Sequence, residues 1–571
     1  MAKLAHLKIS HFRGIESFEQ KFVNGITCII GRGDSGKSTI LDAIAYLFSQ
    51  SWSVHLNDSD FYKCNTNIPI VIEGVISSVP EDMLAKYGKH IRGLKNDCVL
   101  VDDMESADAV DAESVLTIRL SVGKDLEPSW NIVSYNGEEP SIIKANDRAK
   151  LNVFSVSDYT DRHFSLNKGN PLYSLYKQIN EGAVLDDENK VLDVIREAKL
   201  EFDKSIGGKF DAVIKEITKM ASTLGVTLQD MKAMLDHRDI AISENKVSIH
   251  EGGVPFRLKG KGTKRLLSLA IQLALTEPSG VILIDEIEQG LEPDRVQHLV
   301  NVLSKYKDRQ IIITTHSRNV LVELPCDALY IMTENAQKLK HVEGEVQGCI
   351  RKNPEALFAK KILVCEGATE IGLCRALNNF RCTKEKESLA CKGVCLADGT
   401  GRELEKYVMG FNNLGFKTAL LCDSDDNKVN KLKQTFKDAG VEIVDCEDEL
   451  AFEQQMFKDV SWQIVQEVVS LYNAICKTEK GLSDEDAKRM AFNQVKEKRA
   501  NKESYNENWL ATESDELRNA LGLAAKSGDG WYKRISKAEA LGNILFSHYD
   551  EIAAETHIKF EFGKLITWIE S

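Results

Sequence analysis

Gly31-Arg32-Gly33-Asp34-Ser35-Gly36-Lys37-Ser38-Thr39 is the stretch that decides the fold of the first half of the chain. It matches the phosphate-binding loop pattern and lies between an apolar run typical of a buried strand and an amphipathic helix predicted to begin near Thr39. Backbone N–H groups at such a helix start bind phosphate oxygens, Lys37 adds a positive charge, and the Ser38 hydroxyl is a Mg²⁺ ligand. The flanking strand and helix disfavour a chance glycine-rich loop. The pattern therefore predicts a nucleotide site formed by Gly31, Gly33, Ser35, Gly36, Lys37, Ser38 and Thr39.

A second motif supplies the acidic half of this site. An apolar run at 281–284 ends in Asp285, placed to bind Mg²⁺, and Glu286, placed to polarise an attacking water. His316 follows another predicted strand, at the position expected of a sensor of the γ-phosphate. A lone histidine at a strand end is usually structural, so its catalytic role depends on the other two motifs.

A group of carboxylates is predicted in the second half of the chain. Glu366 and Glu370 follow one predicted strand, and Asp423 and Asp425 follow another. The carboxyl ends of parallel strands meet at one edge of a sheet, and a four-residue offset places Glu370 near Glu366. Oxygen ligands without a matching His/Cys set suit Mg²⁺ or Mn²⁺ better than Zn²⁺. A single acidic loop is more often solvated surface, so the two strands together carry this prediction.

Composition excludes several classes of protein. The 571 residues are 43% hydrophobic and 28% charged, which indicates two to four globular domains. The net charge of −14 argues against a non-specific coat for nucleic acid. There is no apolar run long enough to span a membrane, no export signal, and an odd number of scattered cysteines, 13. We therefore expect a cytoplasmic protein with reduced thiols and no membrane partner.

Three further stretches resemble the ABC-type ATPases of the RecF, SMC and OLD (overcoming lysogenization defect) group. They are FRGI at 12–15, KGKGTKRLLSLA at 259–270 and EIEQGLEP at 286–293. In that group a glycine-bearing signature caps the ATP held by the other protomer, so the resemblance implies a homodimer or higher homo-oligomer. The signature residues it implies here are Gly260, Gly262 and Arg265, with Lys261 where a serine is frequent.

The carboxylate motifs resemble the TOPRIM domain, and an ABC ATPase followed by TOPRIM resembles the OLD family. One metal ligand of this domain is assigned to Glu453, and the nearby Glu447 and Glu449 are alternatives to it. A catalytic lysine is assigned to Lys533, and the alternative is that Lys533 is an ordinary surface residue. The resemblance implies a divalent-metal site of Glu366, Glu370, Asp423, Asp425 and Glu453, with Glu366 also as catalytic acid or base and Lys533 as a catalytic lysine that stabilises the phosphorane.

The predicted fold class is α/β, with an ABC-type P-loop ATPase followed by a TOPRIM domain with helical C-terminal additions. Charged helical patterns at 191–198 and 210–217 indicate a helical insertion for dimerisation. The expected domains are the N-terminal ATPase lobe at 1–165, the insertion at 166–240, the C-terminal ATPase lobe at 241–345 and TOPRIM at 355–571.

The family resemblance implies an ATP-binding and hydrolysing, Mg²⁺- or Mn²⁺-dependent DNA endonuclease in anti-phage defence. The alternatives are a repair or recombination ATPase whose TOPRIM domain only binds, and an effector that cleaves RNA. A topoisomerase is disfavoured because no tyrosine-bearing cleavage domain is recognisable. Family members act alone, beside a UvrD-like helicase as in the Gabija system, or with a retron reverse transcriptase and its DNA, and the sequence leaves these partners open.

Overall fold

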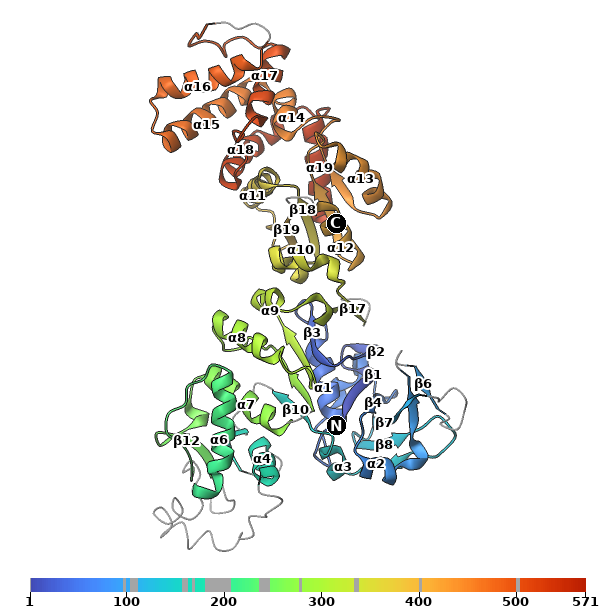
Figure 1. Cartoon of the computed structure of the whole chain (residues 1–571). Helices are drawn as coiled ribbons and strands as arrows, with labels where there is room; N and C mark the ends of the chain where they lie inside the picture. Colours follow the sequence, from blue (N-terminus) through green and yellow to red (C-terminus); the bar gives the residue numbers. More distant parts are fainter. Residues whose placement is uncertain are drawn as a thin grey trace. The chain divides into compact units, whose positions relative to one another are not determined.

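The computed structural model describes residues 2–95, 99–102, 111–156, 163–166, 170–179, 207–235, 247–276, 280–332, 338–399, 403–499 and 504–571. The chain divides into two compact units, Met1–Val342 and Glu343–Ser571 (Figure 1). Among the described residues, no helix is both long enough and apolar enough to cross a membrane.

The first unit contains both β-rich and helical parts. Its strands are β1 Lys3–Phe12, β2 Ile15–Lys21, β3 Gly25–Ile30, β4 Ile70–Ser77, β5 Arg92–Leu94, β6 Leu100–Val101, β7 Glu113–Val122, β8 Pro128–Val133, β9 Ser141–Ile142, β10 Val153–Val156, β11 Met231–Leu235, β12 Val247–Glu251, β13 Val254–Pro255, β14 Val281–Ile284, β15 Gln310–Thr315, β16 Leu329–Met332 and β17 Leu339–His341. Its helices are α1 Lys37–Leu47, α2 Glu81–Lys86, α3 Ala145–Ala149, α4 Pro171–Ile179, α6 Gly207–Thr223, α7 Lys261–Leu275, α8 Pro293–Leu303 and α9 Arg318–Glu323.

Helix α1 lies between two sheets of this unit. One sheet has the order β2-β1-β4-β7-β5-β6, with β8 and β9 attached to β7, and the other has the order β10-β14-β15-β3-β16-β17. The apolar side chains of α1 join a single core with residues of both sheets, such as Ile72 and Leu283. A Cβ on Gly74 of β4 would lie 2.6 Å from a methyl group of Leu47, so only glycine permits this close approach of helix and sheet.

Parallel pairing brings the predicted nucleotide motifs to one edge of the second sheet. Strand β15 pairs in parallel with both β3 and β14, and all residues of β14 and β15 are buried. Because the three strands run in the same direction, the residues that follow them lie side by side. The loop after β3, Asp285 after β14 and His316 after β15 therefore share one edge.

Helices α4, α6 and α7 pack together with the small sheet β11-β12-β13 (teal to green in Figure 1). Met231–Leu235 lies within the helical insertion expected at 166–240, but it forms strand β11 because it pairs antiparallel with β12. The helical pattern expected at 191–198 lies outside the described residues. The division of this unit into two lobes and a dimerisation insertion remains a prediction.

The second unit contains a four-stranded parallel sheet with many helices. Its strands are β18 Lys361–Cys365, β19 Val394–Asp398, β20 Lys417–Leu421 and β21 Glu442–Val444. Its helices are α10 Gln347–Lys352, α11 Ala368–Thr383, α12 Leu404–Asn413, α13 Asn427–Asp438, α14 Phe452–Asp459, α15 Trp462–Lys480, α16 Asp484–Glu497, α17 Asp515–Lys526, α18 Ile535–Ser547 and α19 His557–Glu570.

The central strands of this sheet are β18 and β20, in the order β19-β18-β20-β21. Helix α11, which follows β18, packs closely on α18 from much later in the chain. A Cβ on Gly372 would lie 2.4 Å from the Cβ of Ala538, and a Cβ on Gly542 would lie 2.5 Å from that of Ala376. Small residues on both helices therefore fix the C-terminal helices against the element that carries Glu370.

Candidate nucleotide and metal sites

The phosphate-binding loop closes on the side chain of Lys37. Its ammonium group donates to the carbonyl oxygens of Gly31 at 2.9 Å and Arg32 at 2.7 Å. Burial lowers the pKa of Lys37, and the nearby carboxylates, Asp285 first, act in the opposite direction. Gly36 begins α1 with φ of 92°, a conformation that favours glycine. The loop thus presents the start of α1, with its free N–H groups, and a cation in one place.

Asp285 links the second motif to this loop. Its Oδ1 accepts hydrogen bonds from Ser38 Oγ at 3.1 Å and from Thr314 Oγ1 at 2.5 Å. The structure therefore brings together the two residues predicted to bind Mg²⁺ beside the nucleotide. An aspartate and a serine hydroxyl are oxygen ligands that suit this ion.

The loop after Asp285 has a conformation that the sequence did not predict. Glu286 has φ of 45°, and its backbone N–H donates to Thr314 Oγ1 at 2.8 Å. Glu288 accepts from the His316 N–H at 2.6 Å and from Thr315 Oγ1 at 2.7 Å. No local sequence pattern indicates this positioning role of Glu288, because its partners follow a strand that lies further along the chain. The catalytic roles of Glu286 and His316 remain predictions.

The signature residues lie at the start of α7. Gly260 precedes the helix, and a Cβ on Gly262 would lie 2.4 Å from the Gly290 carbonyl oxygen. Arg265 is buried, and its guanidinium donates to the Asp285 and Glu286 carbonyl oxygens, the latter at 2.8 Å.

Arg265 therefore holds the acidic loop of its own chain. This contact ties the signature helix to the residues that would bind Mg²⁺. Contacts of Gly260, Gly262 and Arg265 with a nucleotide, and the sandwich of ATP between two protomers, remain predictions.

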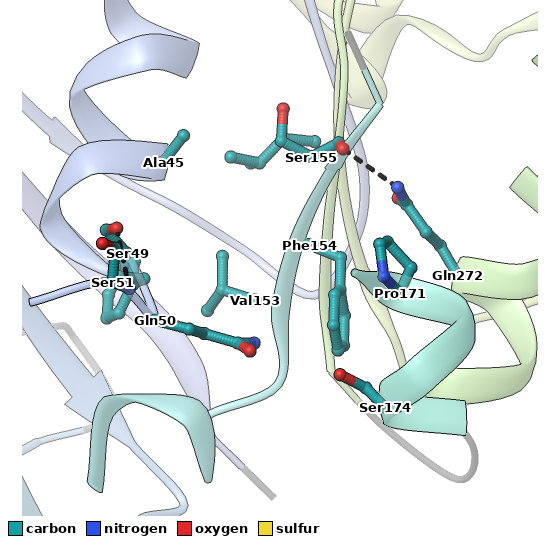
Figure 2. A pocket seen from close by; sticks show the side chains of 12 residues that line it. Ala45, Ser49, Gln50, Ser51, Val153, Phe154, Ser155, Pro171, Ser174 and Gln272 are labelled. Carbon is teal, nitrogen blue, oxygen red and sulfur yellow. Dashed lines mark hydrogen bonds between the residues drawn. The ribbon is translucent and has the colours of Figure 1, made fainter. Parts of the chain in front are cut away.

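A cavity of about 380 Å³ lies in the same unit, between the end of α1, β10, α4 and α7 (Figure 2). Phe154 and Pro171 line it, and Gln272 donates to the Ser155 carbonyl oxygen at 2.9 Å. Among the residues that the structure describes, its lining contains no charged side chain and no residue of the phosphate-binding loop. This cavity is therefore separate from the nucleotide site.

The predicted carboxylates of the second unit converge where β18 and β20 end. The Glu366 carboxylate accepts from the Asp423 N–H at 2.9 Å, and the Glu366 N–H donates to the Leu421 carbonyl oxygen at 3.0 Å. Glu370, in the first turn of α11, accepts from the Gly367 N–H at 2.8 Å. Asp423 accepts from the Phe452 N–H at 2.8 Å, at the start of α14, which carries Glu453.

Burial of this carboxylate cluster raises the pKa of its members. Burial raises the pKa of Glu366 to about 7, and nearby carboxylates add to the effect. Burial also raises the pKa of Asp423 to about 6 and that of Glu453 to about 7. The pKa of Glu370 rises well above its usual range, first through burial and then through the charge of Asp423. Buried acids at this density need protons or bound cations to balance their charge.

The carboxylate groups of the cluster are of the chemical kind that binds divalent metal ions. Glu453 is 3% exposed, and its Oε1 has no hydrogen-bond partner within the described part of the chain. An unpartnered buried carboxylate oxygen costs free energy that a cation ligated there would recover. Hard oxygen ligands suit Mg²⁺ and Mn²⁺. Glu366, Glu370, Asp423, Asp425 and Glu453 are the residues that would hold such an ion.

Two lysines stand beside the cluster. Lys526 lies 2.6 Å from an Asp425 oxygen, and its charge lowers the pKa of Asp423, although burial has the larger and opposite effect. Lys533 is exposed, and it lowers the pKa values of Asp423 and Glu453 in the same way. Lys526 was not predicted from the sequence, since no motif surrounds it.

Lys533 follows a segment that is anchored in the core. Its aliphatic stem lies against Gly530, where a Cβ would meet Lys533 Cγ at 2.5 Å. The neighbouring aromatic residues anchor the backbone in the core, because the Trp531 ring stacks on Tyr472 and the Tyr532 hydroxyl donates to the Val468 carbonyl oxygen. The catalytic role of Lys533 remains a prediction.

A second group with ligand-type side chains, Asp445, His557 and Glu561, has partners of its own. Lys433 lies 2.9 Å from Asp445, and Lys564 lies 3.0 Å from Glu561. These ammonium groups balance both carboxylates, and the network fastens α19 to the end of β21. We interpret it as a structural network.

Three known protein families match parts of this chain. Residues 2–91 match the AAA ATPase domain family, and residues 122–323 match the AAA domain family whose description names the AbiEii toxin and a Type IV TA system. Residues 357–425 match the family described as "Overcoming lysogenization defect protein-like, TOPRIM domain". The chain therefore combines a P-loop ATPase with an OLD-like TOPRIM domain, which confirms the resemblance and the α/β fold class expected from the sequence.

The chain is similar in sequence to several known proteins. The chain is 23% identical over 430 residues to the "Retron Vc95 probable ATPase" of Vibrio cholerae, covering 64% of this chain and 79% of that protein. It is 21% identical over 370 residues to a "DNA replication and repair protein RecF" of Streptococcus thermophilus, covering 58% and 97%. A 128-residue match, 31% identical, to "ABC transporter A family member 1" of Dictyostelium discoideum covers 21% of this chain and only 13% of the transporter. The domains and these relatives support ATPase activity.

Proposed function

We propose that the chain is an ATP-hydrolysing, divalent-metal-dependent endonuclease that cleaves DNA. The observation that carries this proposal is the buried carboxylate cluster at the ends of β18 and β20, with an unpartnered Glu453 oxygen and two lysines beside it. A bound metal ion supplies Lewis acidity, which activates water and stabilises charge on the phosphate. The chain would supply the carboxylate ligands and the two lysine side chains beside them.

Individual residues have distinct tasks in this proposal. Glu366, whose pKa is raised to about 7, exchanges a proton near neutral pH and is suited to general acid–base catalysis. Lys533 is exposed and therefore accessible to a phosphate group of the substrate, whose developing charge it stabilises. In the ATPase, Lys37 binds the phosphates, Ser38 and Asp285 hold Mg²⁺, and Glu286 orients the attacking water.

Plasmid cleavage tests this function. Purified protein is incubated with supercoiled plasmid and Mg²⁺ or Mn²⁺, with and without ATP, beside Glu366→Gln, Lys37→Ala and the exposed control Glu405→Gln on α12. We expect metal-dependent nicking or cutting in the wild type and the control, and at least a 100-fold loss in Glu366→Gln. The Lys37→Ala lane shows whether ATP activates or inhibits the reaction.

The RecF relative, of which the chain covers 97%, favours a second candidate, a repair or recombination ATPase whose TOPRIM domain binds without cutting. The same assay separates the two functions, because a wild type that binds DNA and hydrolyses ATP but leaves plasmid intact under either metal supports this candidate. Parallel reactions with RNA of the same sequence test the third possibility, an RNA substrate.

We also propose that the protein acts as a homodimer in anti-phage defence. The retron ATPase relative supports this setting, with a retron reverse transcriptase and its DNA, or a UvrD-like helicase, as candidate partners. Light scattering with ATP tests the dimer, and a strictly monomeric protein contradicts it. Phage plating on cells that express the wild type or Glu366→Gln tests defence.

A further inference from the structure

Ser424 is the buried residue between two aspartates of the carboxylate cluster, Asp423 and Asp425. It is 0% exposed, and its hydroxyl donates to the carbonyl oxygen of Cys446, just after β21, at 2.5 Å. The two aspartate side chains leave the backbone on either side of Ser424. The orientation of this one residue therefore sets the direction in which both carboxylates point.

The backbone of Ser424 is also held on both sides. Its N–H donates to the Leu450 carbonyl oxygen at 3.0 Å, and its own carbonyl oxygen accepts from the Glu449 N–H at 3.1 Å. Asn430 of α13 donates to the same carbonyl oxygen at 2.7 Å. Because Leu450 lies two residues before α14, these hydrogen bonds connect the loop of the aspartates to the segment that leads to Glu453.

Lys433 of α13 extends a buried ammonium group to the Ser424 hydroxyl. The ammonium group donates to Ser424 Oγ at 2.7 Å and lies 2.9 Å from Asp445 Oδ2. The side chains of Lys433 and Asp445 are only 11% and 20% exposed, and burying such a pair costs free energy that the attraction between the charges offsets only in part. The ion pair alone is therefore a weak reason for a lysine at this position.

The bond to Ser424 gives this lysine a second role. An ammonium group can only donate hydrogen bonds, so it occupies a lone pair of the hydroxyl oxygen. The hydroxyl proton is then directed to its acceptor, the Cys446 carbonyl oxygen. Lys433 thus fixes the orientation of the Ser424 side chain from α13.

We propose that Lys433 acts through Ser424 to position Asp423 and Asp425 for metal binding. This inference rests on the proposed function, because it concerns the ligands of the same site. The hydrogen bonds of Ser424 hold the loop in place before a metal ion arrives, so its aspartates lose little freedom on ligating the ion. Lys433 and Ser424 are positioning residues, since both act through the aspartates.

Mn²⁺ affinity tests the inference without reference to cleavage. Full-length protein free of nucleotide is titrated with Mn²⁺, the free ion is measured by electron paramagnetic resonance, and binding to Glu366→Gln/Asp423→Asn is subtracted as binding outside the cluster. Three variants are compared: Ser424→Ala, Asp445→Asn, and the double variant Lys433→Met/Asp445→Asn. Asp445→Asn breaks the ion pair but leaves Lys433 bonded to Ser424, whereas the double variant removes that bond as well.

We expect Ser424→Ala and the Lys433→Met/Asp445→Asn double variant to bind Mn²⁺ at least about tenfold more weakly than the wild type, and Asp445→Asn to stay within about threefold. Asp445→Asn should nevertheless lower the Tm in EDTA, because the structural network loses a charge. The exposed Lys437 in the last turn of α13 supplies a control, Lys437→Gln, which should match the wild type in both measurements.

Circular dichroism confirms that each variant is folded. Wild-type Mn²⁺ affinity in Ser424→Ala, or equal affinities in Asp445→Asn and the double variant that also lacks Lys433, overturns the inference while leaving the metal site intact. A wild type that binds no more Mn²⁺ than Glu366→Gln/Asp423→Asn overturns the proposed metal site itself.

Discussion

Replacing Glu453 with glutamine should stabilise the metal-free protein at high pH. Burial raises the pKa of Glu453 from 4.5 to about 7 in the folded chain. The folded state therefore binds more protons at this site than the unfolded state, so the free energy of unfolding falls as pH rises from 4.5 to 7. At 1.36 kcal/mol for each tenfold change in the proton equilibrium, the ionised carboxyl costs about 3 kcal/mol above pH 7.

Glutamine has the same shape but no charge to desolvate, and its amide can donate to the neighbouring carboxylates. We expect Glu453→Gln to raise the Tm of the second unit by about 6 °C at pH 8 in EDTA and by little at pH 4.5. The measurement is differential scanning calorimetry of full-length wild type, Glu453→Gln and the exposed control Glu405→Gln at both pH values. An equal effect at both pH values, or a lower Tm for Glu453→Gln at pH 8, would refute the reasoning.

Three other changes test separate parts of the structure. Thr314→Val removes the hydroxyl group that hydrogen-bonds to Asp285 and to the Glu286 N–H. ATP hydrolysis should therefore fall about tenfold, whereas nucleotide affinity, measured with a fluorescent analogue, should change less than about threefold. A parallel loss of affinity would contradict a positioning role. Gly262→Ala places a Cβ 2.4 Å from the Gly290 carbonyl oxygen and should lower the Tm of the ATPase unit by several degrees, and an unchanged Tm would exclude this contact. Gly372→Ala forces apart α11 and α18, so urea unfolding should show that the free energy of unfolding falls by about 1–3 kcal/mol. Gly440→Ala is the control, because a Cβ there meets no atom although φ is 82°, and it should lower the free energy of unfolding by less.

The sequence predicted the parts of the sites that depend on short stretches of chain. A buried parallel strand places the residues that follow it at one sheet edge, so Lys37 and Asp285 could be assigned to one site from local patterns alone. Parallel pairing of β18 and β20 likewise places Glu366 and Asp423, which follow these strands, close together.

The remaining residues depend on contacts that local patterns do not encode. Lys526 reaches Asp425 only because α17 packs on α14, and Glu288 is positioned by the residues that follow β15. Met231–Leu235 is a strand because of its pairing with β12, which overrides the helical spacing of its neighbourhood. The effect of these tertiary contacts could not be read from spacing.

The order of the cluster along the chain has a consequence for synthesis on the ribosome. The sheet residues Glu366 and Asp423 emerge first, but Glu453 follows on α14, and the cations Lys526 and Lys533 come more than 70 residues later still. Helix α11, which carries Glu370, gains its tight partner only when α18 has been made. A nascent chain therefore exposes an incomplete acidic edge until α17 and α18 have been synthesised and have docked, so any nuclease activity of this cluster is withheld until then.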